Sequence, residues 1–368
     1  MSYKETLFFI GQSLTINFEE KNKTAITEQL KKNSVDWDAV VKISTEHYVL
    51  PALYCSLKKA NLLKYLPNDL VQYMQHITDL NRNRNEKIIE QAKELNELLA
   101  ANNITPIFLK GTGNLLEGLY IDLSERMLSD IDFIVSKDDY QKAIQVLLDF
   151  GYEAVHKKEY YYPEFKHYPR IHKKDTKSIA AVEIHKELLA QKYANEFNYE
   201  IVKNDTQYIN NFRVLSYANQ LNLTVIAKQI NDFGNDYKTI SLRNAYDVFL
   251  LSQKSTAKNS IALFDKLYEP LNNFLAVCYE VMGKISSLEY PVTNKTKLYI
   301  HTFYKQLDDT TVIREKHQKK VTKKILYKKR VEYILFAIFK QEFRQWILKR
   351  IIDKEWQRQI LKKLGLKK

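Results

Sequence analysis

The sequence predicts an α+β protein in which a small mixed β-sheet lies between N- and C-terminal helical regions. Apolar residues recur at helical spacing before residue 104 and again from about Asn219 onward. Between these regions, short apolar or alternating segments are separated by turns and by helical segments. The predicted order of helices, then βαβαβββ, then helices is typical of a mixed sheet flanked by helices.

We expect four segments in the 368 residues, a length that allows two or three hydrophobic cores. In chain order they are an N-terminal helical region, a core that contains the sheet, a helical region that packs over this core, and a basic amphipathic helical tail: residues 1–103, 104–215, 216–310 and 311–368. Within the first segment, residues 39–60 and 86–101 each show a helical pattern of apolar residues.

The core segment begins with a strand and a turn rich in glycine. Residues 104–109 form an apolar strand candidate, and Pro106 favours its first residues or an edge position. A helix is predicted over residues 111–120. Three of the chain's eight glycines lie within eight residues here: Gly111, Gly113 and Gly118. This clustering indicates either close approach of the backbone to a ligand or turns that need glycine dihedral angles.

The rest of the core segment contains four more strand candidates and one helix. Residues 129–135 alternate, so Asp130 and Asp132 share one face of a strand and the apolar residues share the other. A helix over 137–150 ends at Gly151. Three strands and two turns follow: strands at 152–155, 166–172 and 179–185, and turns at 160–163 and 173–175.

The paired carboxylates predict a metal site. Asp130 and Asp132 are embedded in apolar residues, where two like charges repel each other unless a cation lies between them. Mg²⁺ suits such a pair because it takes oxygen ligands and shares them with phosphates. On the last strand, Glu183 can complete the site and accept a proton from an attacking hydroxyl. The alternative is a strand with an exposed polar face. For His185 we favour a substrate contact or a partly buried polar residue over catalysis.

The glycine-rich turn predicts a phosphate site. Lys110, Gly111 and Thr112 enter a helix, whose first N–H groups and dipole favour an anion, and Lys110 adds a positive charge. A simple strand-to-helix turn is the alternative. A Walker loop is excluded, because no G-x-x-x-x-G-K-[ST] pattern occurs. Arg126 either clamps a phosphate or forms a structural ion pair.

Together these residues resemble the uncharacterised bacterial nucleotidyltransferase family within the DNA polymerase β-like superfamily. The resemblance spans roughly residues 35–255. In the core segment it rests on Leu-Lys-Gly at 109–111, Leu-Tyr at 119–120, Arg126, Asp-Ile-Asp-Phe-Ile-Val at 130–135 and Val-Glu-Ile-His at 182–185. Upstream it rests on His-Tyr-Val-Leu-Pro-Ala-Leu-Tyr at 47–54. Thr112 stands where the family usually has Ser or Gly.

The resemblance implies that residues 104–215 form a nucleotidyltransferase core. By it, Gly111 and Thr112 bind nucleotide phosphate, while Asp130, Asp132 and Glu183 are catalytic and ligate Mg²⁺ (or Mn²⁺). The implied reaction moves an NMP group from an NTP, such as ATP, to a hydroxyl of a small molecule (a sugar or a biosynthetic intermediate). Two alternatives stay open: a protein-modifying, AMPylation-like enzyme, and a non-catalytic nucleotide- or nucleic-acid-binding protein.

A later helix is also expected near the site. The resemblance places Arg243 and Asp247 on a helix that packs over the core. Contact of either residue with nucleotide is one interpretation, but their spacing of four favours an ion pair on the helix surface.

The basic charge is concentrated at the end of the chain. Residues 311–368 hold 19 Lys+Arg and 5 Asp+Glu, a net charge of +14, whereas the whole chain carries +13. Apolar residues from Val331 to Ile351 trace a stripe at helical spacing. Three interpretations compete: a tail that packs on the body, peripheral attachment to an anionic membrane surface, and RNA binding through residues 314–368.

The remaining composition favours a cytoplasmic protein, with a peripheral membrane position as the alternative. Two distant cysteines argue against a disulfide framework or a cysteine-based zinc site. We see no signal peptide, and the apolar run at 331–339 is about half the length of a membrane span. The acceptor and the oligomeric state are left open by the sequence.

Overall fold

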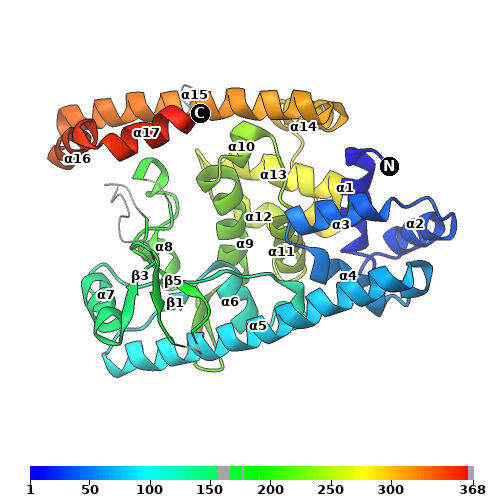
Figure 1. The fold of residues 1–368 in the computed structure, drawn as a ribbon, viewed down its shortest axis with the longest axis horizontal. Coiled ribbons are helices and arrows are strands. Elements are labelled where there is room, and N and C mark those ends of the chain that lie inside the picture. The colour runs from blue at the N-terminus through cyan, green and yellow to red at the C-terminus, as the bar shows by residue number, and fades with distance from the viewer. Residues whose placement is uncertain (156–165, 176–177, 190, 364–368) are drawn as a thin grey trace. The chain divides into compact units, whose positions relative to one another are not determined.

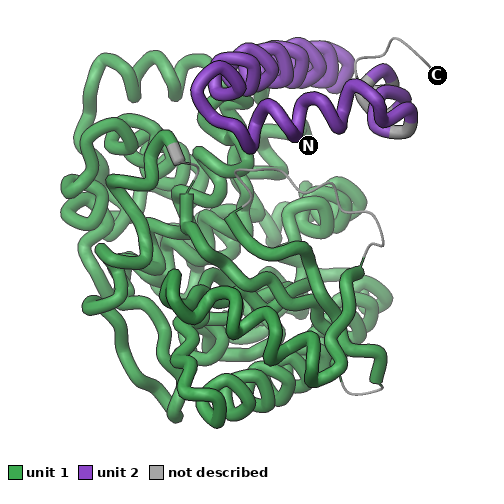
Figure 2. The backbone as a smooth tube through the Cα atoms, turned by 90° about the vertical axis from the view of Figure 1, so that its left-hand side faces the viewer, with its two compact units in different colours: residues 1–157, 166–308 green, residues 158–165, 309–368 purple. Residues whose placement is uncertain are grey.

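The chain forms two compact units in the computed structural model, which describes residues 1–155, 166–175, 178–189 and 191–363. The first unit comprises residues 1–157 and 166–308, and the second comprises residues 158–165 and 309–368 (Figure 2). The turn predicted at 160–163 lies outside the described residues.

Five helices form the N-terminal part, as predicted (Figure 1). They are α1 Tyr3–Ser13, α2 Glu20–Lys31, α3 Trp37–Glu46, α4 Leu50–Lys59 and α5 Asn68–Ala101. The helical pattern over 39–60 is divided between α3 and α4, because Tyr48 has a positive φ of 58° after the end of α3 and Pro51 lies in the first turn of α4. Helix α5 starts well before the predicted residue 86, because its first half packs on α4.

The α+β class with a mixed sheet is confirmed. Among the described residues the sheet has seven strands in the order β3-β4-β5-β2-β1-β7-β6. Their bounds are β1 Ile107–Phe108, β2 Asp130–Ile134, β3 Tyr152–Ala154, β4 Ile171–Lys173, β5 Ala181–His185, β6 Thr206–Ile209 and β7 Phe212–Leu215. The β2–β5 and β1–β7 pairs are parallel, and the other pairs are antiparallel.

The β6–β7 hairpin was not predicted. Its two-residue turn consists of Asn210 and Asn211, both with positive φ. This is the conformation that a tight hairpin turn requires, and Asn tolerates it better than most residues.

The two faces of the sheet differ in polarity. On one face, Ile131, Phe133, Val182 and Ile184 pack against α5 and α7 (Tyr140–Asp149) in a common core. Gly151, with φ of 93°, ends α7 as predicted. The opposite face carries the acidic side chains of β2 and β5. Helix α6, Lys110–Leu116, begins directly after β1 at the edge of this polar face.

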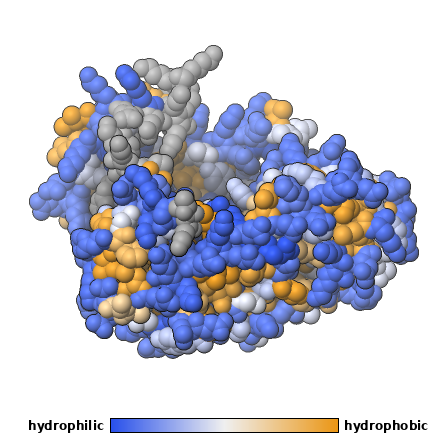
Figure 3. Space-filling model, turned by 60° about the horizontal axis from the view of Figure 1, so that its bottom comes forward, coloured by the Kyte–Doolittle hydropathy of each residue, from blue (hydrophilic) through white to orange (hydrophobic). Residues whose placement is uncertain are grey.

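The polar face is covered by later helices of the same unit. Those bordering it most closely are α9 Tyr217–Ile226, a π-helix at Ala227–Asn231, and α11 Leu242–Ser252. The others are α8 Tyr199–Val202, α10 Gly234–Tyr237, α12 Ala257–Ile261, α13 Tyr268–Val281 and α14 Asn294–Asp308. Most of these helices share a second, larger core with α1–α4. The face that carries α5 is mostly hydrophilic, with separate apolar patches (Figure 3).

The second unit consists of α15 Thr311–Phe339, α16 Gln341–Ile352 and α17 Lys354–Lys363. The stripe predicted from Val331 to Ile351 is interrupted, because Lys340 is extended and separates α15 from α16. Phe343 on α16 is 2 % exposed and contacts the ring of Phe336 on α15. Within the described part of the chain, no helix is both long and apolar enough to cross a membrane.

Candidate active site

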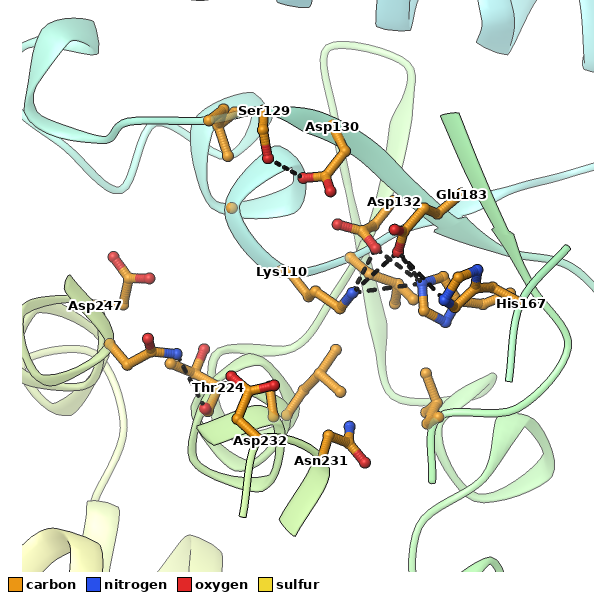
Figure 4. Close-up of a pocket in the computed structure, with 18 of the residues that line it drawn as sticks. Lys110, Ser129, Asp130, Asp132, His167, Glu183, Thr224, Asn231, Asp232 and Asp247 are labelled. Atoms are coloured by element: carbon orange, nitrogen blue, oxygen red, sulfur yellow. Dashed lines mark hydrogen bonds and ion pairs between the residues drawn. The ribbon is translucent and has the colours of Figure 1, made fainter. Parts of the chain in front are cut away.

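A cavity of about 350 Å³ lies between the polar face of the sheet and helices α9 and α11. Lys110, Asp132 and Glu183 point into it from the sheet side (Figure 4). Thr224 and Asp247 lie on the helix side. All the lining residues belong to the first unit, so the cavity is a property of that unit alone.

The register of β2 and β5 places the predicted acids side by side. In this parallel pair, Asp132 lies opposite Glu183 and Asp130 lies opposite Ala181. Because alternate residues of a strand share a face, His185 points to the same side as Glu183. Asp132 and Glu183 are only 4 % and 5 % exposed, so two carboxylates are held together in a largely desolvated position.

Lysine, arginine and histidine side chains lie against these two carboxylates. The Lys110 ammonium lies 2.5 Å from Asp132 Oδ1 and 3.7 Å from Glu183 Oε2. His185 Nε2 is 2.8 Å from the same oxygen of Asp132. Arg170 bridges the two strands, with Nε 2.6 Å from Glu183 Oε1 and Nη2 2.8 Å from Asp130 Oδ2.

One group of side chains is close enough to share a metal ion. One ligand atom each of Asp132, Glu183 and His185 lies within 4.8 Å of the others. This group differs from the predicted set, because His185 takes the place expected for Asp130. The Asp130 carboxylate accepts hydrogen bonds from Ser129 and Arg170 instead, at the mouth of the same cavity.

The cluster perturbs the ionisation of its acids in opposite directions. Burial raises the pKa of Glu183, but His185 and the positive charge of Lys110 outweigh this effect and hold the pKa well below its ordinary value. Burial and the neighbouring charges of Asp132 and Glu183 raise the pKa of Asp130.

Sequence reasoning missed two residues of the site. Arg170 and His167 both line the cavity, and their side chains reach Glu183 from the segment that pairs with β5. The His167 and His185 rings lie 5.2 Å apart. Both missed residues fall in the strand predicted over 166–172, but the sequence did not predict that this strand lies beside β5, so no local signal assigned them to the site.

The glycine-rich turn meets the cavity only in part. Lys110 and Gly111 line the cavity, whereas Thr112 is buried and its hydroxyl donates to the backbone carbonyl of Asp130. A Cβ at Gly111 would lie 2.3 Å from Leu128 Cδ2 and 3.1 Å from Arg126 Nη2. Close packing, rather than an unusual φ, therefore explains this glycine.

Arg126 is buried in the cavity wall and paired. Its Nε donates to Asp247 Oδ2 at 3.0 Å, and Tyr120 donates its hydroxyl to Asp247 Oδ1 at 2.6 Å. The surface ion pair expected between Arg243 and Asp247 is therefore wrong. Asp247 is 1 % exposed, and both of its oxygens are occupied by other residues.

Such a cavity, with clustered acids on one wall and arginines around it, is typical of a site for a polyanion and a divalent cation. Residues 33–279 match the family of uncharacterised nucleotidyltransferases, and the chain belongs to this family. The match includes every predicted site residue. No curated protein and no solved structure gives a significant match.

Proposed function

We propose that this protein is a metal-dependent enzyme that moves an NMP group from an NTP to a hydroxyl of a small molecule. The observation that carries the proposal is the in-register pair of Asp132 and Glu183, buried in the wall of a cavity and accompanied by His185 and Asp130. We further propose a core of the DNA polymerase β-like type, and keep the predicted segment 104–215 as its extent.

The side chains fit a divalent cation. Asp132, Glu183 and His185 offer ligand atoms within 4.8 Å of one another, and Asp130 adds a carboxylate beside them. Their negative charge is shared at present between Lys110 and Arg170, so a cation has compensating charge to replace. We propose Mg²⁺, or Mn²⁺, which also accepts an imidazole. The bound ion would neutralise phosphate charge.

The other residues of the site bind the phosphates and orient the acceptor hydroxyl. We propose that Lys110 and the backbone at Gly111 contact the phosphates, while Thr112 holds the strand end at Asp130. We propose that a carboxylate of this cluster, Glu183 or Asp130, accepts the proton of the acceptor hydroxyl. Arg126 shapes the wall behind them through its pair with Asp247.

Several uncharged polar side chains on the helix side of the cavity suit a hydroxyl-bearing acceptor. Thr224, Asn231 and Asn244 line it together with Asp232. Hydroxyl-rich molecules match such hydrogen-bonding groups, which supports a sugar as the acceptor class. A protein hydroxyl remains the alternative acceptor, and nucleotide binding without catalysis remains the alternative function.

The experiment is a measurement of pyrophosphate release from each NTP with Mg²⁺, with and without a panel of sugars and with α-labelled NTP to detect labelled protein. Release that depends on a sugar supports the proposal. Label transferred to protein supports the AMPylation-like alternative, and binding of NTP without release supports a non-catalytic protein.

The second unit suggests a partner of its own. Ile338, Phe339 and Ile352 are 60 %, 83 % and 79 % exposed in a segment that carries a net charge of +14. Tyr333, Trp346 and Trp356 line an apolar cavity of about 700 Å³ within the unit. We propose that residues 314–368 attach a cytoplasmic protein to an anionic membrane surface, with RNA as the alternative partner.

A further inference from the structure

Arg243 on α11 contributes a guanidinium to the cavity wall without an ion pair to any carboxylate of the described residues. Its Nη1 reaches the carbonyl of Met127 at 3.5 Å, and its guanidinium lies 5.0 Å from the centre of the Tyr48 ring. Its Nε is buried and has no hydrogen-bond partner. The group is therefore positioned by its neighbours but not neutralised by them.

Arg243 has no ion pair with Asp247 because Asp247 accepts hydrogen bonds from other residues. Asp247 lies one helical turn after Arg243, where an ion pair would be ordinary. Instead, one of its oxygens accepts from Arg126 and the other from Tyr120. Two guanidinium groups thus share a wall that holds one buried carboxylate.

An uncompensated charge in this position is costly. Burial lowers the pKa of Arg243, and the charge of Arg126 lowers it further. Burying a guanidinium without an ion pair costs desolvation free energy, so its position in a cavity wall points to an anionic ligand. The other arginines of the cavity, Arg126 and Arg170, already have carboxylate partners.

The structure also holds Tyr48 in place beneath this guanidinium. Tyr48 adopts a positive φ of 58° immediately after α3. The preceding residue, His47, accepts a hydrogen bond at Nδ1 from the N–H of Leu242, the first residue of α11. This bond ties the end of α3 to the start of α11, so the stacked pair of Tyr48 and Arg243 is built from two elements.

We propose that Arg243 binds the β- and γ-phosphates of the NTP, the part that leaves as pyrophosphate. This inference rests on the proposed function, in which the acids of β2 and β5 hold the metal ion and the NTP binds in the same cavity. A planar guanidinium can bind two phosphate oxygens at once, and the nearby Tyr48 ring adds a cation–π contact that helps to hold it in the cavity wall. Arg243 is then a binding residue on the wall opposite the acids.

The test measures binding of inorganic pyrophosphate, ATP and AMP to the full chain by calorimetry with Mg²⁺. The variants are Arg243→Gln, Arg243→Lys and a matched control, Arg213→Gln. Arg213 also stacks on a tyrosine, Tyr208, at 5.9 Å, but it lies on the β6–β7 hairpin and does not line the cavity. Arg243→Gln should weaken pyrophosphate and ATP binding about tenfold or more and leave AMP binding unchanged. Arg243→Lys should restore part of the loss, and Arg213→Gln should bind like wild type.

Thermal unfolding separates a binding role from a structural role. Because Arg243 carries an uncompensated charge, Arg243→Gln should leave Tm unchanged or raise it, whereas Arg126→Gln should lower Tm by removing the partner of buried Asp247. Equal affinity of wild type and Arg243→Gln for pyrophosphate would overturn the inference and leave the proposed function standing. So would a lowered Tm for Arg243→Gln with no loss of affinity. Wild type that binds neither ATP nor pyrophosphate would overturn both.

Discussion

Asp132 on β2 lies directly opposite Glu183 on the parallel strand β5, and the ammonium of Lys110 contacts both carboxylates. Adjacent buried acids repel each other, so a positive group is needed to keep them together. Lys110, at the start of α6, supplies that charge from the glycine-rich turn. The contact between Lys110 and Asp132, which are 22 residues apart in sequence, therefore brings the turn and the acid cluster together in one site.

Replacement of Asp130 by Asn should lower activity without lowering stability. The pKa of Asp130 is raised in the folded chain, so the folded state binds this proton more tightly than the unfolded state does. Stability therefore falls as pH rises from the pKa of Asp130 in the unfolded chain to its higher pKa in the folded chain. Asp130→Asn should keep or raise Tm at pH 8 and reduce pyrophosphate release about 100-fold. A Tm at pH 8 below that of wild type would contradict this account of the carboxylate.

His47 should make stability fall in mild acid. Burial lowers its pKa to about 4, from an ordinary value of 6.5. Because the folded pKa lies below the unfolded one, the stability is present above pH 6.5 and is lost as pH falls toward 4. By the linkage relation, the free energy of unfolding falls by about 2 kcal/mol between pH 7 and pH 5. Urea unfolding at both pH values should show a smaller decrease for His47→Gln than for wild type; an equal decrease would exclude His47 as the source.

Position 111 should require glycine, because the Leu128 side chain leaves no room there for a Cβ atom. An added Cβ meets Leu128 Cδ2 at 2.3 Å, so Gly111→Ala should destabilise the protein by roughly 1–3 kcal/mol. Leu128→Ala removes the clashing atom. The double variant should therefore lose less stability than the sum of the two single variants in urea unfolding. Strict additivity would show that the clash is relieved elsewhere, and that Gly111 is not held by Leu128.

The second unit should bind anionic vesicles through both charge and apolar residues. The full chain should sediment with vesicles of anionic phospholipid at low salt, less so at high salt, and not with neutral vesicles. Replacing Ile338 and Phe339 by Ser should weaken this binding. Leu263→Ser is a matched control, because Leu263 is 86 % exposed and Phe339 is 83 % exposed, but Leu263 belongs to the first unit. Binding of wild type that does not depend on lipid charge, or an equal effect of the control, would contradict the proposal.

The sequence predicts those features that depend on local periodicity. Alternation along residues 130–134 and 181–185 placed Asp130, Asp132, Glu183 and His185 on one side of two strands, and the structure has them there. Helix α7 and its glycine end were predicted for the same reason. Tight turns without Gly or Pro were missed, as at Asn210 and Asn211, because their positive φ leaves little trace in composition.

Partners across the fold could not be predicted. The sequence spacing of Arg243 and Asp247 favoured a surface pair, but Asp247 lies on the buried side of α11 and accepts hydrogen bonds from Arg126 and Tyr120, more than a hundred residues away. Arg170 likewise reaches Glu183 only because β4 pairs with β5. Roles that depend on such long-range contacts follow from tertiary packing.

The most direct test of the central claim is pyrophosphate release by purified wild type, Asp132→Asn and Asp138→Asn with Mg²⁺ and each NTP. Asp138 is an exposed acid shortly after the same strand, so its variant controls for the loss of one charge. We expect release by wild type and Asp138→Asn, and a reduction of about 100-fold or more in Asp132→Asn with a circular dichroism spectrum like that of wild type. Equal release by Asp132→Asn would contradict the claim that the Asp132–Glu183 pair is the catalytic centre.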